Sequence, residues 1–376
     1  MKILHISKYY EPFKGGIEKV ILELASGSVK QGHEVVVLSS NVDWRYKEDM
    51  IEGVKVIRLP RAGVAFSQPM TMSFLWKAKK WMEWADVVQV HTPNPLAELS
   101  FLWQDNQVPL IATYHCDVVR QKKLYQAYKP ICQKLLNRAD RITVSTPLHL
   151  EYSELLQDHK HKAVVIPFGV RAKHAKRTPE INENLKKIKD QYGDYFLFIG
   201  RLVPYKGVDI LLHAMKEIRE NLVIVGQGPR WESWHALAKE LHVDEKVHFL
   251  GRVDDDAEFA AYLHGCHSLV LPSVDESEAF GIVLIEAMSC GSPVITTNLK
   301  SGVPWVNDQG VTGLQVEPGQ ADPLAQALKT VATDHELRYR MGEAAKARFQ
   351  KLFQVETMVQ AYIDLYADCV PAEKVA

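Results

Sequence analysis

The chain has 376 residues, which is too long for one typical hydrophobic core and predicts two domains of roughly 170–200 residues each. Hydrophobic residues make up 47% and charged residues 24% of the sequence, and the net charge is -1, so the composition is that of a globular protein with no general affinity for nucleic acid. The five cysteines form no CxxC pair, which fits reduced thiols in a cytoplasmic protein, and no apolar run reaches the roughly 18 residues that span a bilayer.

The first half of the chain is predicted to alternate strands with helices. The opening MKILHIS turns polar too soon for a signal peptide and is interpreted as a buried first strand, followed by a helix over about 17–31. Near-continuous Val and Ile runs indicate strands that are buried on both faces, as in parallel sheets. Further strands are predicted at 34–40, 54–60, 86–92, 109–115, 140–146 and 163–169.

The second half repeats this pattern after a charged stretch. Residues 173–190 lack a strong apolar stripe and are interpreted as a linker, with or without a short helix at its end, between an N-terminal domain, 1–172, and a C-terminal domain, 191–353. Three helices are predicted at the C-terminus, the last from about residue 354. The second series of strands is predicted at 195–201, 221–228, 247–251, 267–273, 293–298 and 313–318.

Ligands of parallel sheets bind at the carboxyl ends of the strands, so the cleft between the two domains is the expected site. The stretch 271–296 passes from a strand end through an acidic loop into a helix at about Gly281. The start of that helix, Phe280–Val283, favours an anion such as phosphate, and Glu278 and Glu286 flank it. A capped helix with two surface acids is an equally open interpretation of the local pattern.

Glycines and cations follow the first strands of the C-terminal domain. Arg201 comes directly after Gly200, and Lys206 precedes Gly207. Two cations at a strand end suit a diphosphate, although they also suit a surface without a ligand. Three further positions follow the next two strands: Gly226, in a turn that either packs closely or contacts ligand, and Arg252 and Val253, which are candidates to border a nucleobase.

Two features of the N-terminal domain are candidates for ligand contact. Gly15 and Gly16 stand where the first helix begins, so that backbone can approach a ligand closely, or they form a simple tight turn. His115 ends a strand and is expected to point into the cleft, as a catalytic or as a structural residue. In the C-terminal domain, Asp254–Asp256 are interpreted as a helix N-cap with first-turn acids, and no metal site is predicted.

The N-terminal half is basic and the C-terminal half acidic. Residues 1–170 hold 22 Lys and Arg against 17 Asp and Glu, whereas residues 171–376 hold 23 against 29. Two segments, 74–84 and 118–138, interleave basic and aromatic residues; the second includes Arg120, Lys122 and Lys123. Such faces bind anionic lipid or are simply solvated over an apolar core, and both interpretations remain open.

Together these motifs resemble the retaining nucleotide-sugar glycosyltransferases of family 4, whose GT-B fold has two Rossmann-like domains facing a cleft. The resemblance rests on ESEAFGIVLIEAMSCGSPVI, GRLVPYKG, VGQGP, GGIE and the strand-end histidine, in matching order along essentially the whole chain. It implies an acceptor-binding N-terminal domain, completed by a C-terminal helix of about 354–376. It also implies a C-terminal domain that binds the nucleotide sugar.

The resemblance also implies roles for the site residues. Arg201 and Lys206 hold the donor diphosphate with backbone amides near Gly16, Glu278 contacts the donor sugar, Glu286 binds the ribose, and His115 orients the sugar. The family generally needs neither metal nor cofactor. The implied catalytic residues are His115, Glu278, Arg201 and Lys206, and the implied donor-binding residues add Gly15, Gly16, Gly226, Arg252, Val253, Phe280, Gly281, Ile282, Val283 and Glu286.

The segment 301–319 and the run YHCDVVRQKK look most like bacterial mannosyltransferases of O-antigen or capsule biosynthesis. This likeness implies GDP-mannose as donor, a glycan or polyprenyl-diphosphate-linked saccharide as acceptor, and a cytoplasmic enzyme at the inner face of the membrane. A UDP-sugar donor, a nucleotide-sugar 2-epimerase and a non-catalytic sensor are the alternatives. A dehydrogenase is disfavoured because no dinucleotide fingerprint follows either first strand.

Overall fold

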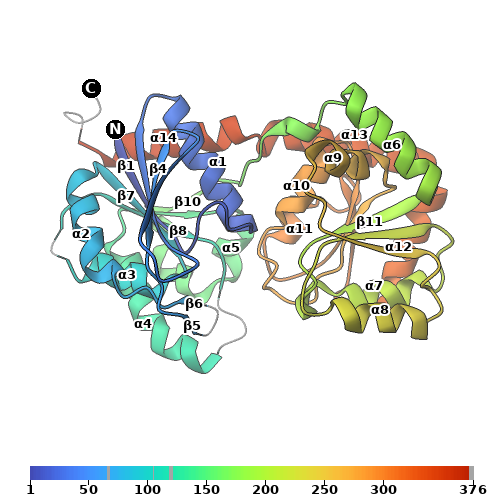
Figure 1. Cartoon of the computed structure of the whole chain (residues 1–376), viewed down its shortest axis with the longest axis horizontal. Helices are drawn as coiled ribbons and strands as arrows, with labels where there is room; N and C mark the ends of the chain where they lie inside the picture. Colours follow the sequence, from blue (N-terminus) through green and yellow to red (C-terminus); the bar gives the residue numbers. More distant parts are fainter. Residues whose placement is uncertain (66–67, 105, 118–121, 372–376) are drawn as a thin grey trace. The chain divides into compact units, whose positions relative to one another are not determined.

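The computed structural model describes residues 1–65, 68–104, 106–117 and 122–371, without the side chains of 122–124. It divides the chain into two compact units (Figure 1). Unit 1 contains residues 1–169 together with the C-terminal helix α14 (Val355–Cys369), and unit 2 is Val170–Gln354. Unit 1 therefore takes its last helix from the far end of the chain.

Unit 1 is built on an eight-stranded sheet in the order β10-β9-β8-β7-β1-β2-β4-β3. The pairs are parallel except for β3, which runs antiparallel to β4 and was not predicted. A separate two-stranded ribbon, β5 (Val64–Ala65) and β6 (Gln68–Pro69), follows β4 along the chain. The strands of the sheet are β1 (Lys2–Ile6), β2 (Glu34–Ser40), β3 (Lys47–Ile51), β4 (Val54–Leu59), β7 (Val87–Thr92), β8 (Leu110–Tyr114), β9 (Arg141–Val144) and β10 (Ala163–Val165).

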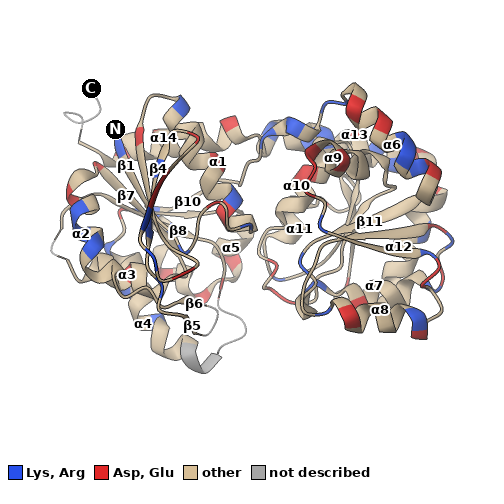
Figure 2. Ribbon diagram, in the orientation of Figure 1, with Lys and Arg blue, Asp and Glu red and all other residues tan. Residues whose placement is uncertain are grey.

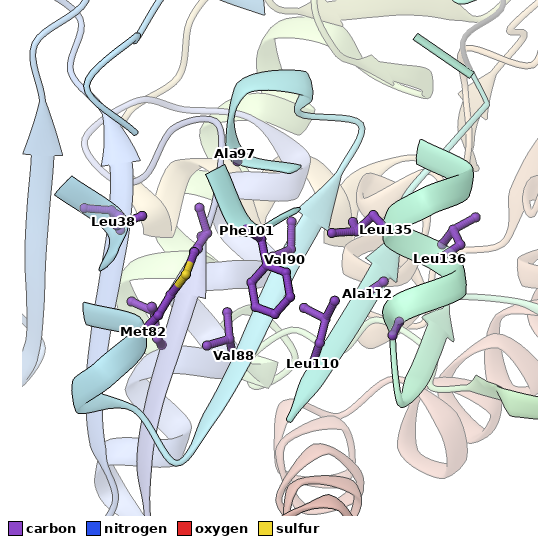
Figure 3. Close-up of a cluster of buried hydrophobic side chains, with 14 of the residues drawn as sticks. Leu38, Met82, Val88, Val90, Ala97, Phe101, Leu110, Ala112, Leu135 and Leu136 are labelled. Atoms are coloured by element: carbon purple, nitrogen blue, oxygen red, sulfur yellow. The ribbon is translucent and has the colours of Figure 1, made fainter. Parts of the chain in front are cut away.

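One face of this sheet carries the apolar core of unit 1. Alternate strand residues such as Val88 and Val90 pack against Phe101 and Met82, and a cluster of aliphatic side chains completes the layer (Figure 3). Burying each large apolar side chain contributes roughly 1.5–3 kcal/mol. The helices of this face are α2 (Phe74–Trp84), α3 (Pro95–Leu102) and α4 (Lys122–Arg138).

The opposite face of the same sheet is polar where α14 packs against it. Tyr366 Oη donates to Gln89 Oε1, and Tyr362 Oη donates to Thr143 Oγ1 at 3.1 Å. Thr113 Oγ1 lies 2.8 Å from Thr143 Oγ1, so the strand side chains also bond to one another. This face is covered by α14 and by α1 (Gly16–Lys30), which contact each other. Two shorter helices, α5 (Pro147–Tyr152) and η1 (Glu154–Lys162), follow β9.

Unit 2 is a six-stranded, fully parallel sheet in the order β13-β12-β11-β14-β15-β16. Its strands are β11 (Tyr195–Ile199), β12 (Asn221–Val225), β13 (Val247–Gly251), β14 (Leu269–Leu271), β15 (Val294–Thr297) and β16 (Gly313–Val316). Its helices are η2 (Ala172–His174), α6 (Pro179–Tyr192), η3 (Pro204–Lys206), α7 (Val208–Met215), α8 (Trp231–Glu240), α9 (Asp256–Gly265), α10 (Ile282–Ser289), α11 (Val303–Val306), α12 (Ala321–Thr333) and α13 (His335–Leu352).

The expected linker, 173–190, is instead part of unit 2. Thr178 caps α6 by accepting the N–H of Ile181 at 3.2 Å, and α6 packs against α9. Only Ile181, Ile188 and Tyr192 of this helix are buried. Because so few of its residues are apolar, the segment has the composition of a solvated linker although it folds as an amphipathic helix.

In each of the two large sheets, the order in which strands are added reverses at the first strand of the unit. In unit 1, β1 pairs with β2 on one side and with β7 on the other; in unit 2, β11 pairs with β12 and with β14. Ligands of open parallel sheets bind outside the carboxyl ends of the strands at such switch points. We therefore expect ligand-binding residues directly after β1, β7, β11 and β14.

Candidate functional site

A buried ion pair lies at the switch point of unit 2. Lys206 follows β11 and Glu278 follows β14, and Nζ of the lysine pairs with Oε2 of the glutamate. Ser273 Oγ donates to the same oxygen at 3.1 Å. Burial lowers the pKa of Lys206, but the charges of Glu278 and Tyr205 and the hydrogen bond to Glu278 together raise it by more, so the pKa lies above its ordinary value. Lys206 is therefore cationic at neutral pH.

The two loops that carry this pair are held together by backbone contacts. Val274 N–H donates to the carbonyl oxygen of Tyr205 at 2.8 Å. Gly207 has φ 65°, and a Cβ at this residue would lie 2.1 Å from the carbonyl oxygen of Pro272. Any side chain at position 207 would push the loops apart, so this glycine fixes the distance between Lys206 and Glu278.

The N-terminus of α10 lies in the same loop as Glu278. Gly281 is its N-cap, with φ 78°, and accepts the N–H of Leu284 at 2.8 Å. The N–H groups of Ile282 and Val283 have no backbone acceptor among the residues that the structure describes. Unpaired N–H groups with a helix dipole behind them are suited to an anion. Helix α10 also carries Glu286, which is 7% exposed.

The remaining predicted donor-binding residues of unit 2 lie at the same edge of the sheet. Arg201 is exposed directly after Gly200, and a Cβ on Gly200 would lie 3.5 Å from Cε of Lys206. A Cβ on Gly226 would lie 1.9 Å from the carbonyl oxygen of Gly200, so the close packing of these two loops requires a glycine at this position. Arg252 is exposed beside Val253 and pairs with Asp254 at 3.0 Å.

The prediction that Asp254–Asp256 cap a helix is confirmed. Asp255 is the N-cap of α9 and accepts the N–H of Glu258 at 2.7 Å. Asp256 pairs with Lys173 at 2.7 Å. In the described part of the chain, no group of three or more His, Cys, Asp or Glu residues is arranged to hold a metal ion.

In unit 1, the predicted glycines lie at the start of α1, in the loop that follows β1. Gly15 is the N-cap and Gly16 the first helical residue, and a Cβ on Gly15 would lie 2.1 Å from a carboxylate oxygen of Glu18. Burial raises the pKa of Glu18 and lowers that of Lys8, and each charge partly offsets the shift of the other. Lys8 was not predicted, although its place just after the first strand marks it as a candidate.

His115 belongs to a buried chain of three histidines. Its Nε2 lies 3.0 Å from Nδ1 of His91, and Nε2 of His91 lies 3.2 Å from Nδ1 of His5. The rings of His91 and His115 stack with centroids 5.2 Å apart. Burial lowers the pKa of His5 and of His115 to about 3, and that of His91 well below its usual value.

Sequence reasoning missed His5 and His91. A signal was present, because His5, Gln89, His91 and Thr113 are polar residues at alternate positions of otherwise apolar strands. Polar residues on one face of a strand buried on both sides need partners there. The row of hydrogen-bonded histidines crosses the switch point of unit 1, since His5 is in β1 and His91 is in β7.

The basic-aromatic segments are described in part. Residues 118–121, including Arg120, lie outside the described residues, as do the side chains of Lys122 and Lys123. The described basic residues include those of α2, which Figure 2 shows as a group. Trp76 and Trp103 are 61% and 79% exposed. A pocket of about 300 Å³ lies between α3 and α4, lined by Leu99, Leu102, Trp103, Pro130, Ile131 and Lys134.

Two protein families match consecutive parts of this chain. Residues 14–174 match the family described as Glycosyltransferase Family 4, and residues 179–348 match Glycosyl transferases group 1. These two ranges hold the residues that the structure gathers at its two switch points, except for His5 and Lys8.

Curated relatives match almost the whole chain. The O-antigen chain mannosyltransferase C of Escherichia coli is 30% identical over 97% of this chain and 98% of its own length. The D-rhamnosyltransferase WbpZ of Pseudomonas aeruginosa is 34% identical over 94% of this chain and 92% of its own length.

Solved structures show the same fold. The sucrose-phosphate synthase of Thermosynechococcus elongatus superimposes with a TM-score of 0.83 at 22% identity, covering 98% of both chains. HepE of Anabaena, solved in complex with UDP-glucose, superimposes with a TM-score of 0.78 at 20% identity, covering 98% of this chain and all of HepE. At these identities the likeness concerns the fold alone.

Proposed function

This chain belongs to the family 4 glycosyltransferases of the GT-B fold, and on that premise we propose that it is a retaining mannosyltransferase that uses GDP-mannose. The acceptor that we propose is a polyprenyl-diphosphate-linked saccharide of a cell-surface polysaccharide. The proposal for mannose is supported by the O-antigen mannosyltransferase relative at 30% identity. Transfer of D-rhamnose is the second candidate, because a D-rhamnosyltransferase is 34% identical.

The observation that carries the proposal is the Lys206–Glu278 pair beside the N-terminus of α10. A diphosphate gains negative charge as it leaves the sugar, and the cationic Lys206 and the N–H groups of Ile282 and Val283 stabilise that charge. Arg201 is exposed beside them and supplies a guanidinium that can bind two phosphate oxygens at once.

The carboxylates of Glu278 and Glu286 are assigned to hydroxyl groups of the donor. Glu278 is an acceptor for hydroxyl groups of the sugar, and its bond to Ser273 keeps it oriented when Lys206 turns toward phosphate. We assign Glu286 to the ribose hydroxyls and His115 to the sugar. In the reaction that we propose, the acceptor hydroxyl attacks from the face that the diphosphate leaves, and the leaving phosphate takes its proton. No metal is assigned to this step.

A lipid-linked acceptor places the enzyme at a membrane surface. Among the described residues, no helix has the length and apolar character to cross a bilayer. Helix α2 buries Phe74, Ala78 and Met82, and its other side exposes Trp76 with Lys77, Lys79 and Lys80. Exposed tryptophan among lysines is suited to an anionic lipid surface, so we propose peripheral binding through α2 and the neighbouring α3–α4 pocket.

A panel of nucleotide sugars tests the donor. A ligand that binds only the folded protein raises its melting temperature, so GDP-mannose should raise it more than UDP-, ADP- or dTDP-sugars. Transfer of labelled mannose to a synthetic polyprenyl-diphosphate saccharide then tests the reaction. A larger shift with a UDP-sugar, or conversion of the donor alone to its C2 epimer, would replace the proposed function with the corresponding alternative.

A further inference from the structure

The three buried histidines of unit 1 form a hydrogen-bonded chain in which the ring protons can be arranged in only two ways. Three neutral imidazoles carry three N–H groups, and the two His–His hydrogen bonds take two of them. The third N–H must therefore stand at one end of the chain, on Nε2 of His5 or on Nδ1 of His115. Among the described residues, both of these nitrogens are buried and have no hydrogen-bond partner.

The two arrangements differ in where the unpaired N–H lies. His5 is 0% exposed in β1, a central strand with β2 on one side and β7 on the other. An N–H on Nε2 of His5 would be buried without an acceptor among the described residues, and a buried unpaired N–H is less tolerated than a buried unpaired acceptor. His115 lies beyond the end of β8, where a ligand of a parallel sheet binds. The arrangement with the N–H on His115 is therefore favoured.

A second unpaired ring nitrogen lies at the same edge of the sheet. His149 follows β9, the parallel neighbour of β8, and its Nδ1 lies 3.2 Å from Thr146 Oγ1. Its Nε2 is buried without a partner in the described part of the chain. After burial, the charge of His149 is the next cause that lowers the pKa of His115, so the two rings are within electrostatic reach. Two unsatisfied nitrogens beyond the ends of two neighbouring strands indicate a site for a polar ligand.

We propose that His5 and His91 are positioning residues, which hold His115 in the Nδ1–H tautomer so that it donates a hydrogen bond to an oxygen of the transferred sugar. The identity of that ligand rests on the proposed function; the tautomer does not. In this state each of the three histidines carries its proton on Nδ1. His115 is then a donor and cannot serve as the base that deprotonates the acceptor.

The charge of the chain fits this role. The sugar ring becomes positive in the transition state of glycosyl transfer, and an imidazolium next to it would repel that charge. Burial keeps all three rings neutral at physiological pH. A neutral N–H donor orients a sugar oxygen without adding positive charge to the site.

The direct test is nitrogen NMR of the full-length protein labelled with ¹⁵N-histidine. Protonated and unprotonated ring nitrogens have well-separated ¹⁵N shifts, and the His5, His91 and His115 signals are assigned from H5F, H91F and H115F variants. The expected result is a proton on Nδ1 and none on Nε2 of His115. A proton on Nε2 of His115 would overturn the proposal, whether or not the protein transfers mannose.

Transfer kinetics give a second readout. H91F removes the donor to His115 and should lower kcat roughly 10–100-fold, the range known for losing the partner that orients a metal-bound histidine. H91Q keeps one donor and one acceptor and should restore part of that loss. The matched control is H159F, which replaces another buried histidine of unit 1 outside the chain. Equal kcat in H91F and H159F, or no difference between H91F and H91Q, would contradict the positioning role.

Discussion

The two switch points of this protein have the same topology, but an ion pair joins the strand ends in unit 2 whereas neutral imidazoles join the central strands in unit 1. In unit 2 the strand ends hold a buried cation and carboxylate, Lys206 and Glu278. In unit 1 the corresponding pair of strands, β1 and β7, is bridged by the neutral rings of His5 and His91. The same parallel-sheet geometry thus holds the charged side chains of Lys206 and Glu278 where we place the diphosphate. It holds hydrogen-bonded neutral histidines where we place the transferred sugar.

The largest expected effect is at Lys206. K206M should lower kcat/KM by roughly 10²–10³, because the leaving diphosphate loses its cation. It should also cost about 3–5 kcal/mol of stability, since Glu278 is left buried and unpaired. Steady-state kinetics and urea unfolding measure the two effects.

A double variant separates these contributions. K206M/E278M removes both charges and should regain most of the stability while transfer stays lost. If the double variant were as unstable as K206M, the ion pair would not be the cause of the destabilisation.

The histidines of unit 1 should make stability sensitive to acid. The pKa of His5 and of His115 is about 3 in the folded protein and about 6.5 in the unfolded chain, so their contribution is present above pH 6.5 and is lost as pH falls toward 3. Each contributes a slope of up to about 1.4 kcal/mol per pH unit, with His91 adding a third. Urea unfolding between pH 7 and pH 5 should show a smaller slope in H5F than in the wild-type protein. A slope in H5F equal to that of the wild-type protein would mean that folding does not lower the pKa of His5.

Glu286 should contribute to the affinity for the nucleotide sugar. E286A should weaken the affinity for the nucleotide sugar by roughly 1–3 kcal/mol, the range for a hydrogen bond to a charged group. Calorimetric titration measures this loss, and unchanged donor affinity would refute the ribose contact. D308A, which removes an exposed carboxylate of unit 2, is the control.

Membrane binding should depend on the surface of α2. Replacing Lys77, Lys79 and Lys80 by glutamate should release the protein from anionic vesicles and leave transfer to a soluble acceptor intact, since each lysine near such a surface contributes about 1 kcal/mol. The matched control inverts three exposed lysines of unit 2: Lys186, Lys187 and Lys216. Vesicle binding that persists in the first variant, or is lost equally in the control, would place the membrane surface elsewhere.

The smallest effect is expected at Arg252. Its ion pair with Asp254 is exposed, so R252A should change stability by at most about 1 kcal/mol. A loss of donor affinity in this variant would support the assignment of Arg252 to the nucleobase, and unchanged affinity would remove Arg252 from the donor site.

The sequence predicted the parallel strands of both sheets because buried parallel strands are runs of Val, Ile and Leu. Strand β3, KEDMI, was missed because it is polar and half-exposed at the sheet edge. Helix α6 was interpreted as a linker because only three of its residues are buried. The motifs of unit 2 were found by their glycines, but the pairing of Lys206 with Glu278 joins residues 72 positions apart. The histidine chain likewise depends on strand order, which the spacing of His5, His91 and His115 does not reveal.

The affinity for GDP in two variants tests the central claim most directly. GDP carries the diphosphate and lacks the transferred sugar, so its affinity should depend on Lys206 and not on the histidine chain. Calorimetric titration should show GDP affinity reduced in K206M and unchanged in H91F, although both variants transfer slowly. If K206M bound GDP as the wild-type protein does, or if H91F lost as much affinity as K206M, the division of labour between the two switch points would be wrong.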